Sequence, residues 1–254
     1  MKILVVITTA FTSTGGLTTV MMNYYRAMNK EGLKIDFAST NVPSQSLLDE
    51  IHVEGSEYYQ LPPRKKIVFY FYRLRRLCKN YDLLHVHGNS STSVLELMAA
   101  NWAGVKRRIV HNHTSRSQHP WINLLLHPFF LMSYTKAIAC SDAAGEWLFG
   151  NKQYQILRNA IKVSCFHYDV SVRQQIRQLL GISDSTFLVG HVGKFMDAKN
   201  HPFVIAVFAE IHRLIPDSKL LLVGDGPLRG MVETAVKNLH VEDCVILVGL
   251  RSDI

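Results

Sequence analysis

The chain has 254 residues, of which 48% are hydrophobic and 19% are charged, and this composition is typical of a soluble globular protein with one large or two ordinary domains. Its four cysteines lie far apart and form no CxxC pair, which argues against a disulfide framework and a cysteine-rich zinc site and favours a reducing cytoplasm. The formal net charge of +8 favours acidic partners such as phosphorylated ligands, nucleic acid or an anionic membrane face.

No segment has the pattern of a signal peptide or a membrane span. Residues 3–7 form an apolar run that is too short for a signal sequence and has no small-residue cleavage site after it. The longest later apolar stretch, residues 121–140, is interrupted by His127-Pro128 and Lys136, so it lacks the roughly 20 uninterrupted residues of a transmembrane helix. We expect a buried strand over residues 3–7 and no transmembrane helix.

The first part of the chain alternates short β-branched runs with longer helical stretches, which predicts β-α-β units around a parallel sheet. Ser141 and Asp142 are suited to begin a helix that Gly150 ends. The expected strands cover residues 2–7, 34–39, 83–87, 108–113 and 136–140.

A second, shorter series of the same kind follows. Residues 159–181 connect the two series and contain a polar helical segment, residues 172–180. A parallel sheet usually has more than three strands, so the second unit is expected to be incomplete. Its expected elements are strands over residues 187–192, 219–223 and 245–248, a helix over residues 201–214 and a helix after Pro227.

Basic and aromatic residues are concentrated between Arg64 and Lys79. If this segment is a helix, Val68, Phe71, Tyr72 and Arg75 fall near one face, as in helices that lie at a membrane surface. The alternative is a core helix with a solvated basic face. The basic residues of the segment are Arg64, Lys65, Lys66, Arg73, Arg75, Arg76 and Lys79.

Ligands of open parallel sheets bind beyond the carboxyl ends of the strands, and the first strand is followed by Gly15 and Gly16. This glycine pair precedes a helix whose N-terminal amides can face an anion. A plain tight turn is the alternative.

Two strands end in histidine pairs, His85 with His87 and His111 with His113. Alternation along a strand puts both members of a pair on one face of the sheet. No carboxylate or cysteine joins them at ligand spacing, so we expect hydrogen-bonding imidazoles and no metal. His87 and His113 are expected to point into the cleft, and His85 and His111 to be hydrogen-bonded within their strands.

The second series begins with a strand that ends at Gly193. Lys194 and Lys199 follow, and His201-Pro202 then begins a helix. Ammonium groups beside free helix amides predict a phosphate site, although loop lysines are ordinarily solvated.

Later glycines also follow strands. Gly224 and Gly226 allow a tight turn before Pro227, and Gly249 precedes Arg251. Each of these motifs is ambiguous when taken alone.

Taken in order, the motifs resemble the bacterial members of glycosyltransferase family 4, especially the capsular and exopolysaccharide enzymes. The resemblance covers the whole chain. It rests on Gly15-Gly16, His113-Thr114-Ser115, Ile138-Ala139-Cys140-Ser141, Arg158-Asn159-Ala160-Ile161, Gly193-Lys194-Phe195, Lys199-Asn200-His201, Gly224-Asp225-Gly226-Pro227-Leu228 and Gly249-Leu250-Arg251-Ser252-Asp253.

The resemblance implies an α/β protein of the GT-B type, with two Rossmann-like domains. Residues 1–163 would form the complete acceptor-binding domain, and residues 164–254 would contain a linker and a truncated domain for the nucleotide sugar. It also implies a retaining reaction without an obligatory metal or a further cofactor, with a donor that is expected to be UDP-linked.

The resemblance also implies roles for single residues. His113 would contact the donor sugar near the reacting carbon, and Lys194 with Lys199 would hold the diphosphate, whose developing charge cations stabilise. His87 and Ser115 would lie on the acceptor side. The other donor-binding residues would be Gly15, Gly16, Gly193, Gly226 and Arg251.

Two departures from the family pattern matter. Lys194 stands where the family usually has arginine, which keeps the charge but loses bidentate recognition. The family's pair of glutamates separated by seven residues would lie after residue 254, so we expect the chain alone to be inactive.

Three alternatives stay open: a nucleotide-sugar 2-epimerase, a noncatalytic half that binds a membrane or partner, and a dehydrogenase, although the GxGxxG turn is missing. The expected partners are a nucleotide sugar, a glycan or lipid-linked acceptor and an anionic membrane, not nucleic acid. The expected location is the cytoplasm, peripherally at the inner face of the plasma membrane.

Overall fold

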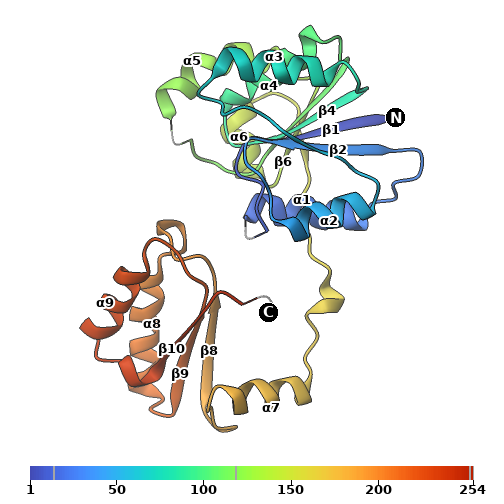
Figure 1. The fold of residues 1–254 in the computed structure, drawn as a ribbon. Coiled ribbons are helices and arrows are strands. Elements are labelled where there is room, and N and C mark those ends of the chain that lie inside the picture. Colours follow the sequence, from blue (N-terminus) through green and yellow to red (C-terminus); the bar gives the residue numbers. More distant parts are fainter. Residues whose placement is uncertain (14, 118, 252, 254) are drawn as a thin grey trace. The chain divides into compact units, whose positions relative to one another are not determined.

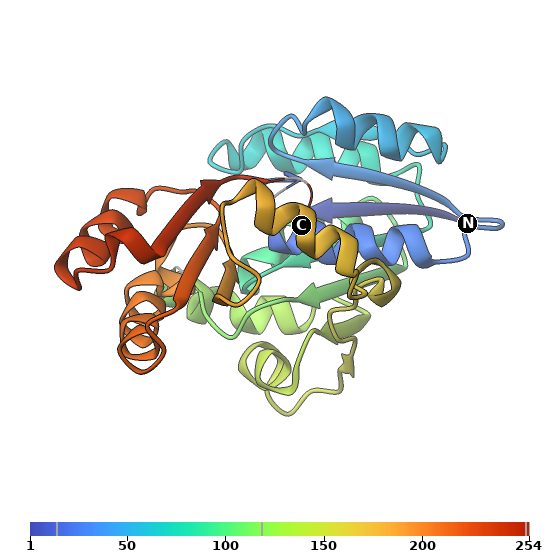
Figure 2. The ribbon, with the colours of Figure 1, turned by 90° about the horizontal axis from the view of Figure 1, so that it is seen from below.

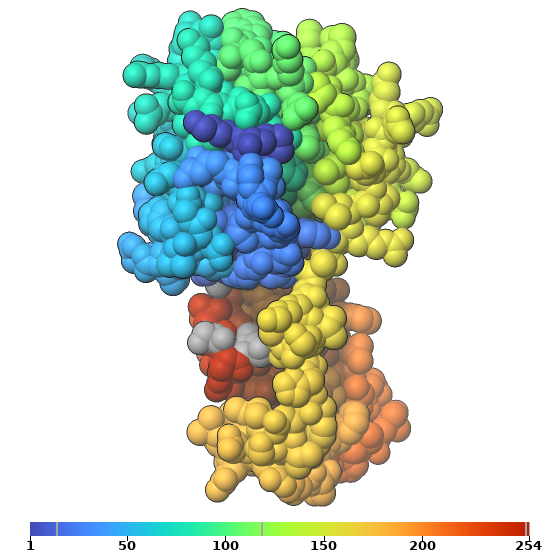
Figure 3. All heavy atoms as spheres, turned by 90° about the vertical axis from the view of Figure 1, so that its right-hand side faces the viewer, coloured from blue at the N-terminus to red at the C-terminus, as the bar shows by residue number. Residues whose placement is uncertain are grey.

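The computed structural model describes residues 1–13, 15–117, 119–251 and 253. The chain divides into two compact units, Met1–Cys165 and Phe166–Ile254 (Figure 1). This division lies two residues after the predicted boundary between residues 163 and 164. Residues 157–172 are exposed throughout, and Figure 3 shows the yellow part of this segment at the surface.

The first unit contains a seven-stranded parallel sheet in the order β3-β2-β1-β4-β5-β6-β7. The chain moves outward from β1 to β3 and then returns to β4, so the strand order reverses between β1 and β4, where ligands of such sheets bind. The strands are β1 (Lys2–Ile7), β2 (Lys34–Ser39), β3 (Tyr58–Gln60), β4 (Leu83–Gly88), β5 (Arg107–Asn112), β6 (Lys136–Ala139) and β7 (Gln155–Ile156).

Alternate residues of β1 point to opposite faces of the sheet and belong to two separate hydrophobic cores. Val5 and Ile7 pack with α1 (Gly16–Ala27) and α2 (Gln45–Val53). Leu4 and Val6 belong to the core on the other face, where helices cover the sheet as Figure 1 shows. The helices that contribute to this second core are α3 (Ile67–Cys78), α4 (Val94–Trp102), α5 (Pro120–Leu131) and α6 (Asp142–Phe149).

The second unit contains a three-stranded parallel sheet in the order β10-β9-β8 (Figure 2). Its core is built from Leu220 and Leu222 of β9 together with apolar residues of α8 and α9. The elements of this unit are α7 (Val170–Leu179), β8 (Phe187–Val192), α8 (His201–Leu214), β9 (Ser218–Val223), α9 (Arg229–Asn238) and β10 (Val245–Gly249).

The eight predicted strands are all present, with ends shifted by at most one residue. β3 and β7 were not predicted, because strands of three and two residues at the sheet edges have little period-two pattern to detect. Ser141 caps α6 through a hydrogen bond from the amide of Ala144, and Gly150 ends this helix with a positive φ of 55°. No helix in the described part of the chain is both long enough and apolar enough to cross a bilayer.

Candidate functional site

Four histidines stack at the carboxyl ends of β4 and β5. His87 and His111 are direct partners in the parallel register, and His85 and His113 extend the stack on either side. The ring centroids of neighbouring imidazoles are 4.1 to 5.7 Å apart. Nδ1 of His87 and Nε2 of His113 form a hydrogen bond of 2.9 Å, so the two histidines that were predicted to face the cleft contact each other.

Burial keeps all four imidazoles neutral at pH 7. It lowers the pKa of His85 and of His113 to about 4 and that of His111 to about 2, and it lowers the pKa of His87 well below its usual value. A neutral imidazole has one donor and one acceptor nitrogen. The bond to His87 therefore fixes whether the remaining nitrogen of His113 donates or accepts.

The prediction that His85 and His111 are hydrogen-bonded within their strands is wrong for three of their nitrogens. Neither ring nitrogen of His111 has a hydrogen-bond partner among the described residues, and the same holds for Nε2 of His85. The imidazoles of His85 and His111 stack on neighbouring histidine rings, and no described polar group forms a hydrogen bond with these three nitrogens.

A cavity of about 160 Å³ adjoins the histidine stack, between α1 and the sheet. Its wall is largely apolar and includes Val5, Met21 and Phe37. His85, His87 and His111 also line it, and each offers one nitrogen within 4.8 Å of the others. These three could ligate a metal by spacing, and none of the described residues that line the cavity carries a carboxylate.

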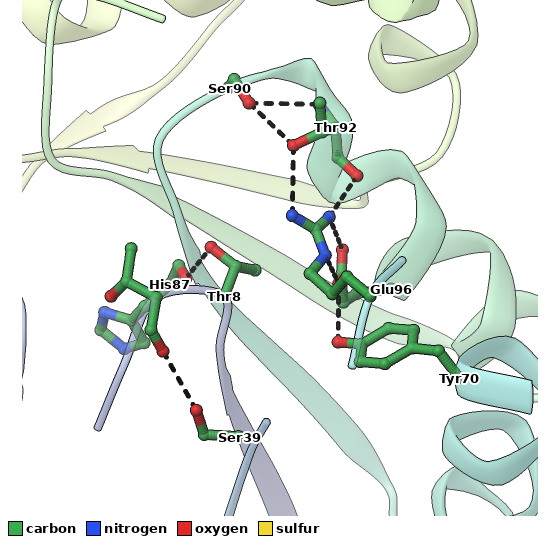
Figure 4. Close-up of polar contacts among 9 residues, drawn as sticks. Thr8, Ser39, Tyr70, His87, Ser90, Thr92 and Glu96 are labelled. Atoms are coloured by element: carbon green, nitrogen blue, oxygen red, sulfur yellow. Dashed lines mark hydrogen bonds and ion pairs between the residues drawn. The ribbon is translucent and has the colours of Figure 1, made fainter. Parts of the chain in front are cut away.

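The loop after β4 is held by a buried ion pair. Glu96 of α4 has no exposed surface, lies 3.0 Å from Nε of Arg64 and accepts a 2.7 Å hydrogen bond from the hydroxyl of Tyr70 (Figure 4). Nη2 of Arg64 also donates to the carbonyl of Thr92 at 2.8 Å. Arg64 therefore belongs to a network of hydrogen bonds and an ion pair with Glu96 and Thr92. The sequence analysis had placed it among the exposed basic residues of this segment.

The ends of β1 and β4 are joined directly. The amide and the hydroxyl of Thr8 both donate to the carbonyl of His87, at 3.0 and 3.1 Å (Figure 4). A side chain at Gly88 would place its Cβ 2.2 Å from Oγ of Ser93. These contacts fix the backbone that carries His87.

Gly15 and Gly16 lie at the start of α1, as predicted. Gly15 is the N-cap and makes no side-chain capping bond, so the first amides of α1 have no side-chain partner there. A Cβ on Gly16 would meet nothing within 4 Å, which leaves this end of the helix open to a ligand. Thr14 lies outside the described residues.

The loop that carries Ser115 is tied to α6. Nδ2 of Asn112 donates to the carbonyls of Thr114 and Ala144, both at 2.7 Å. Ser115 itself is exposed, so its hydroxyl is accessible.

In the second unit, the loops that follow β8 and β9 contact each other through their backbones. The amide of Gly193 donates to the carbonyl of Val223 at 2.9 Å. A Cβ on Gly224 would lie 2.1 Å from the carbonyl oxygen of Gly193, and one on Gly226 would lie 2.4 Å from that of Phe195. Both positions therefore require glycine for the contact between the loops. The sequence analysis predicted only a tight turn at these two glycines.

Lys194 and Lys199 are both exposed beside these loops. The side chain of Lys199 extends over Gly193, because its Cδ and Cε lie 3.4 and 3.5 Å from the position of a Cβ there. Asn200 then takes a left-handed conformation, with φ of 46°, and α8 begins. The lysines, the glycine-lined loops and the start of α8 thus lie at one sheet edge.

The remaining predicted residue, Arg251, pairs with Asp253 two residues further on, at 2.8 Å between Nε and Oδ1. Ser252 lies outside the described residues. The predicted site residues therefore fall into two groups, one in each unit: Gly15, Gly16, His87, His113 and Ser115, and Gly193, Lys194, Lys199, Gly226 and Arg251.

Comparison with known sequences finds one matching family model and several relatives. The model of Glycosyltransferase Family 4 matches residues 14–162. The glycosyltransferase EpsF of Bacillus subtilis is 26% identical over an alignment of 256 positions that covers 94% of this chain and 66% of EpsF. The N-acetylgalactosamine-N,N'-diacetylbacillosaminyl-diphospho-undecaprenol 4-alpha-N-acetylgalactosaminyltransferase of Campylobacter jejuni is 26% identical over an alignment of 203 positions that covers 74% of this chain and 52% of that enzyme.

The fold is shared with a solved structure, that of HepE from Anabaena in complex with UDP-glucose. The TM-score is 0.79 at 18% identity, and the match covers 100% of this chain and 70% of HepE. The chain therefore spans 66% and 52% of the two relatives in length and has the GT-B fold of such enzymes over the units described above.

Proposed function

The chain belongs to glycosyltransferase family 4, and we propose that it takes part in the transfer of a sugar from a nucleoside diphosphate donor to a glycan or lipid-linked acceptor of a cell-surface polysaccharide. We further propose that the donor carries UDP and that the anomeric configuration is retained, as the family resemblance implies. UDP-glucose in the HepE structure supports the first of these statements.

The proposal rests on the groups that lie beyond the carboxyl ends of the strands in the second sheet. Two ammonium groups, the start of α8 and two loops in backbone contact lie together there. A diphosphate needs cations and free amides that are in place before it binds. Because Gly224 and Gly226 permit the close contact of the loops, the backbone around Lys194 and Lys199 is held without a bound ligand.

We assign His113 to the donor sugar and Gly16 to the donor phosphate. His113 is neutral at pH 7, because burial lowers its pKa to about 4. A neutral imidazole recognises hydroxyl groups and does not compete for the phosphate charge. Gly16 leaves the N-terminus of α1 open to an anion. His87 orients His113, and with Ser115 it is assigned to the acceptor side.

The acceptor is proposed to be lipid-linked because two helices of the first unit expose apolar side chains. On α3, Val68, Phe69 and Tyr72 are 64%, 73% and 63% exposed, beside the exposed Arg73 and Arg76. The name of the Campylobacter relative, with its diphospho-undecaprenol group, is consistent with such an acceptor. Basic and apolar groups on one helix suit the surface of an anionic bilayer.

The apolar stretch that follows His119 forms α5, whose outward side is also apolar. Trp121, Leu124 and Leu125 are 82%, 66% and 72% exposed, and Phe130 alone is buried among the residues of this helix. Soluble proteins rarely expose so many large apolar groups together. We propose that α5 adds to the membrane contact, which would keep the protein peripheral at the inner face of the plasma membrane.

Calorimetric titration with UDP tests the donor site. Charge-assisted contacts are worth on the order of 1.5 to 3 kcal/mol each, so Lys194→Ala/Lys199→Ala is expected to weaken UDP binding by at least about tenfold. Lys237→Ala is the control, because Lys237 is exposed at the far end of α9. His113→Ala should leave the affinity for UDP unchanged, since its imidazole is assigned to the sugar.

Unchanged affinity for UDP in the double lysine variant would refute the donor-site assignment. An epimerase would convert the sugar of a UDP-sugar without any acceptor, so product analysis in the absence of acceptor separates the two enzyme classes.

A further inference from the structure

A cysteine, a histidine and a serine form a hydrogen-bonded chain in the second unit, away from the lysines. The imidazole of His212, in the last turn of α8, lies between two partners. Its Nε2 is 3.3 Å from Sγ of Cys244, and its Nδ1 is 3.1 Å from Oγ of Ser218. The three residues come from α8, from the start of β9 and from the short η4 turn (Glu242–Cys244) before β10.

The surroundings hold the imidazole in this position. Its ring stacks on Phe208, one turn earlier in α8, with centroids 5.9 Å apart. Ser218 is 2% exposed, so its hydroxyl has little access to solvent and is committed to the imidazole. Cys244 is half-buried and packs on the core of the unit through its apolar surroundings. The sulfur is therefore held in place on a residue that is partly exposed.

The arrangement has the chemistry of an activated thiol. When Nδ1–H donates to the serine hydroxyl, Nε2 presents its lone pair to the thiol and can accept its proton. A nucleophile next to a base, with the base oriented by a third group, is the general pattern of an activated side chain. The last turn of a helix also favours a positive charge, which suits an imidazole that has gained a proton.

We propose that Cys244 is a modification site that reacts with low-molecular-weight disulfides. The thiol passes its proton to His212, and the thiolate attacks one sulfur of the disulfide. A new S–S bond forms to Cys244, the S–S bond of the reagent breaks, and the departing thiolate takes a proton. One equivalent of small thiol is released per chain, and no other oxidant or reductant takes part.

The site is separate from the proposed donor site. Ser218 begins β9 and Val245 begins β10, so the chain of three residues lies at the amino ends of these strands. Lys194 and Lys199 follow the carboxyl end of β8. Modification of Cys244 is therefore expected to loosen the packing of α8 against η4 without contacting the diphosphate.

The other cysteines provide references within the same molecule. Burial raises the pKa of Cys78 to about 12, so this thiol should be inert. Cys165 is exposed and should react at the rate of an ordinary accessible thiol. Cys140 is half-buried like Cys244, so it tests whether partial burial alone explains the reactivity.

The test is the rate of mixed-disulfide formation with 2-hydroxyethyl disulfide, followed for each cysteine by peptide mass spectrometry on the whole chain at pH 7. Cys244 is expected to react faster than Cys165, and faster than Cys244 itself in urea. His212→Asn should slow it by at least about tenfold, since it removes the base. His240→Asn is the matched control, because His240 is exposed and has φ of 55°, which asparagine tolerates.

His212→Asn is therefore compared with the chain in urea: a folded variant, whose thiol stays half-buried and has lost its base, should react more slowly than Cys244 in urea, whereas an unfolded variant would react at the urea rate. The proposal fails if Cys244 in the native chain reacts no faster than Cys165, or no faster than Cys244 in urea. It also fails if His212→Asn retains the native rate. Titration with UDP on the same modified sample should give unchanged affinity, so this outcome and that of the donor-site test remain distinct.

Discussion

The two groups of predicted site residues differ in charge and in exposure to solvent. In the first unit they include buried or half-buried imidazoles that are neutral at pH 7. In the second they are exposed ammonium groups beside glycine loops. Contacts of exposed charges weaken with salt, whereas contacts of neutral buried groups do not. The contrast suits the proposed roles, in which imidazoles of the first unit contact sugar hydroxyl groups and lysines of the second unit contact the diphosphate, with the start of α1 in the first unit as a further phosphate contact.

The largest expected effect is the loss of stability of the first unit on acidification. Folded His85, His111 and His113 have pKa values at or below about 4, against an ordinary value of 6.5. Between these values the unfolded chain binds protons that the folded chain does not, so the free energy of unfolding falls as the pH falls below 6.5. Each buried histidine contributes up to about 1.4 kcal/mol per pH unit.

Urea unfolding at pH 7.0 and 5.5, followed by tryptophan fluorescence, measures this effect, because all three tryptophans lie in the first unit. His111→Leu should reduce the acid sensitivity and cost little stability at pH 7, since both ring nitrogens of His111 are buried and have no hydrogen-bond partner in the described part of the chain. His119→Gln is the control, because His119 is exposed. Equal acid sensitivity of His111→Leu and the wild type would contradict the neutral-imidazole description.

The second effect concerns the rigidity of the charged site. Gly224→Ala would place a Cβ 2.1 Å from the carbonyl oxygen of Gly193, at a φ of 144° that side chains rarely adopt. We expect it to destabilise the second unit by about 2 kcal/mol or more and to weaken UDP binding, because the two loops must separate.

Hydrogen exchange of β8 and β9 and calorimetry with UDP measure the two consequences. Gly230→Ala is the matched control, because a Cβ there meets nothing within 4 Å and the residue lies in α9. That variant should be as stable as the wild type or slightly more so. If Gly224→Ala behaves like Gly230→Ala, the loop contact does not hold the site.

These two sites also differ in how far the sequence could predict them. The strand ends, and hence the positions of His87, His113, Gly193 and Lys194, follow from local patterns of β-branched residues and glycines. The stack of imidazoles does not, because it depends on the register that pairs His87 with His111 across two strands.

Contacts between distant segments were likewise missed. Arg64 and Glu96 are 32 residues apart, and no local pattern marks them as partners. Gly224 was read as a turn residue, but its need for glycine comes from the loop after β8. Sequence patterns predict where polar groups lie along each strand, whereas the contacts that hold those groups arise only when strands pair.

The smallest expected effect concerns the proposed membrane contact of α3, whose charges are exposed and therefore screened by salt. Arg73 and Arg76 are exposed beside Val68, Phe69 and Tyr72. The other arginine of the helix, Arg75, donates to the carbonyl of Trp102 and is half-buried. Each exposed basic residue near an anionic bilayer is worth about 1 kcal/mol, so Arg73→Gln/Arg76→Gln should weaken binding to phosphatidylserine vesicles by roughly tenfold or more.

Vesicle sedimentation at low and high salt measures this effect, and raising salt should release the wild type. Lys152→Gln/Lys162→Gln removes the same charge from exposed positions outside α3 and should bind nearly as well as the wild type. Salt-insensitive binding that is lost in Leu124→Ser/Leu125→Ser would move the main contact from the basic surface of α3 to the apolar surface of α5. Equal binding by both charge variants would show that total charge attracts the protein to the bilayer and that α3 has no special part in the contact.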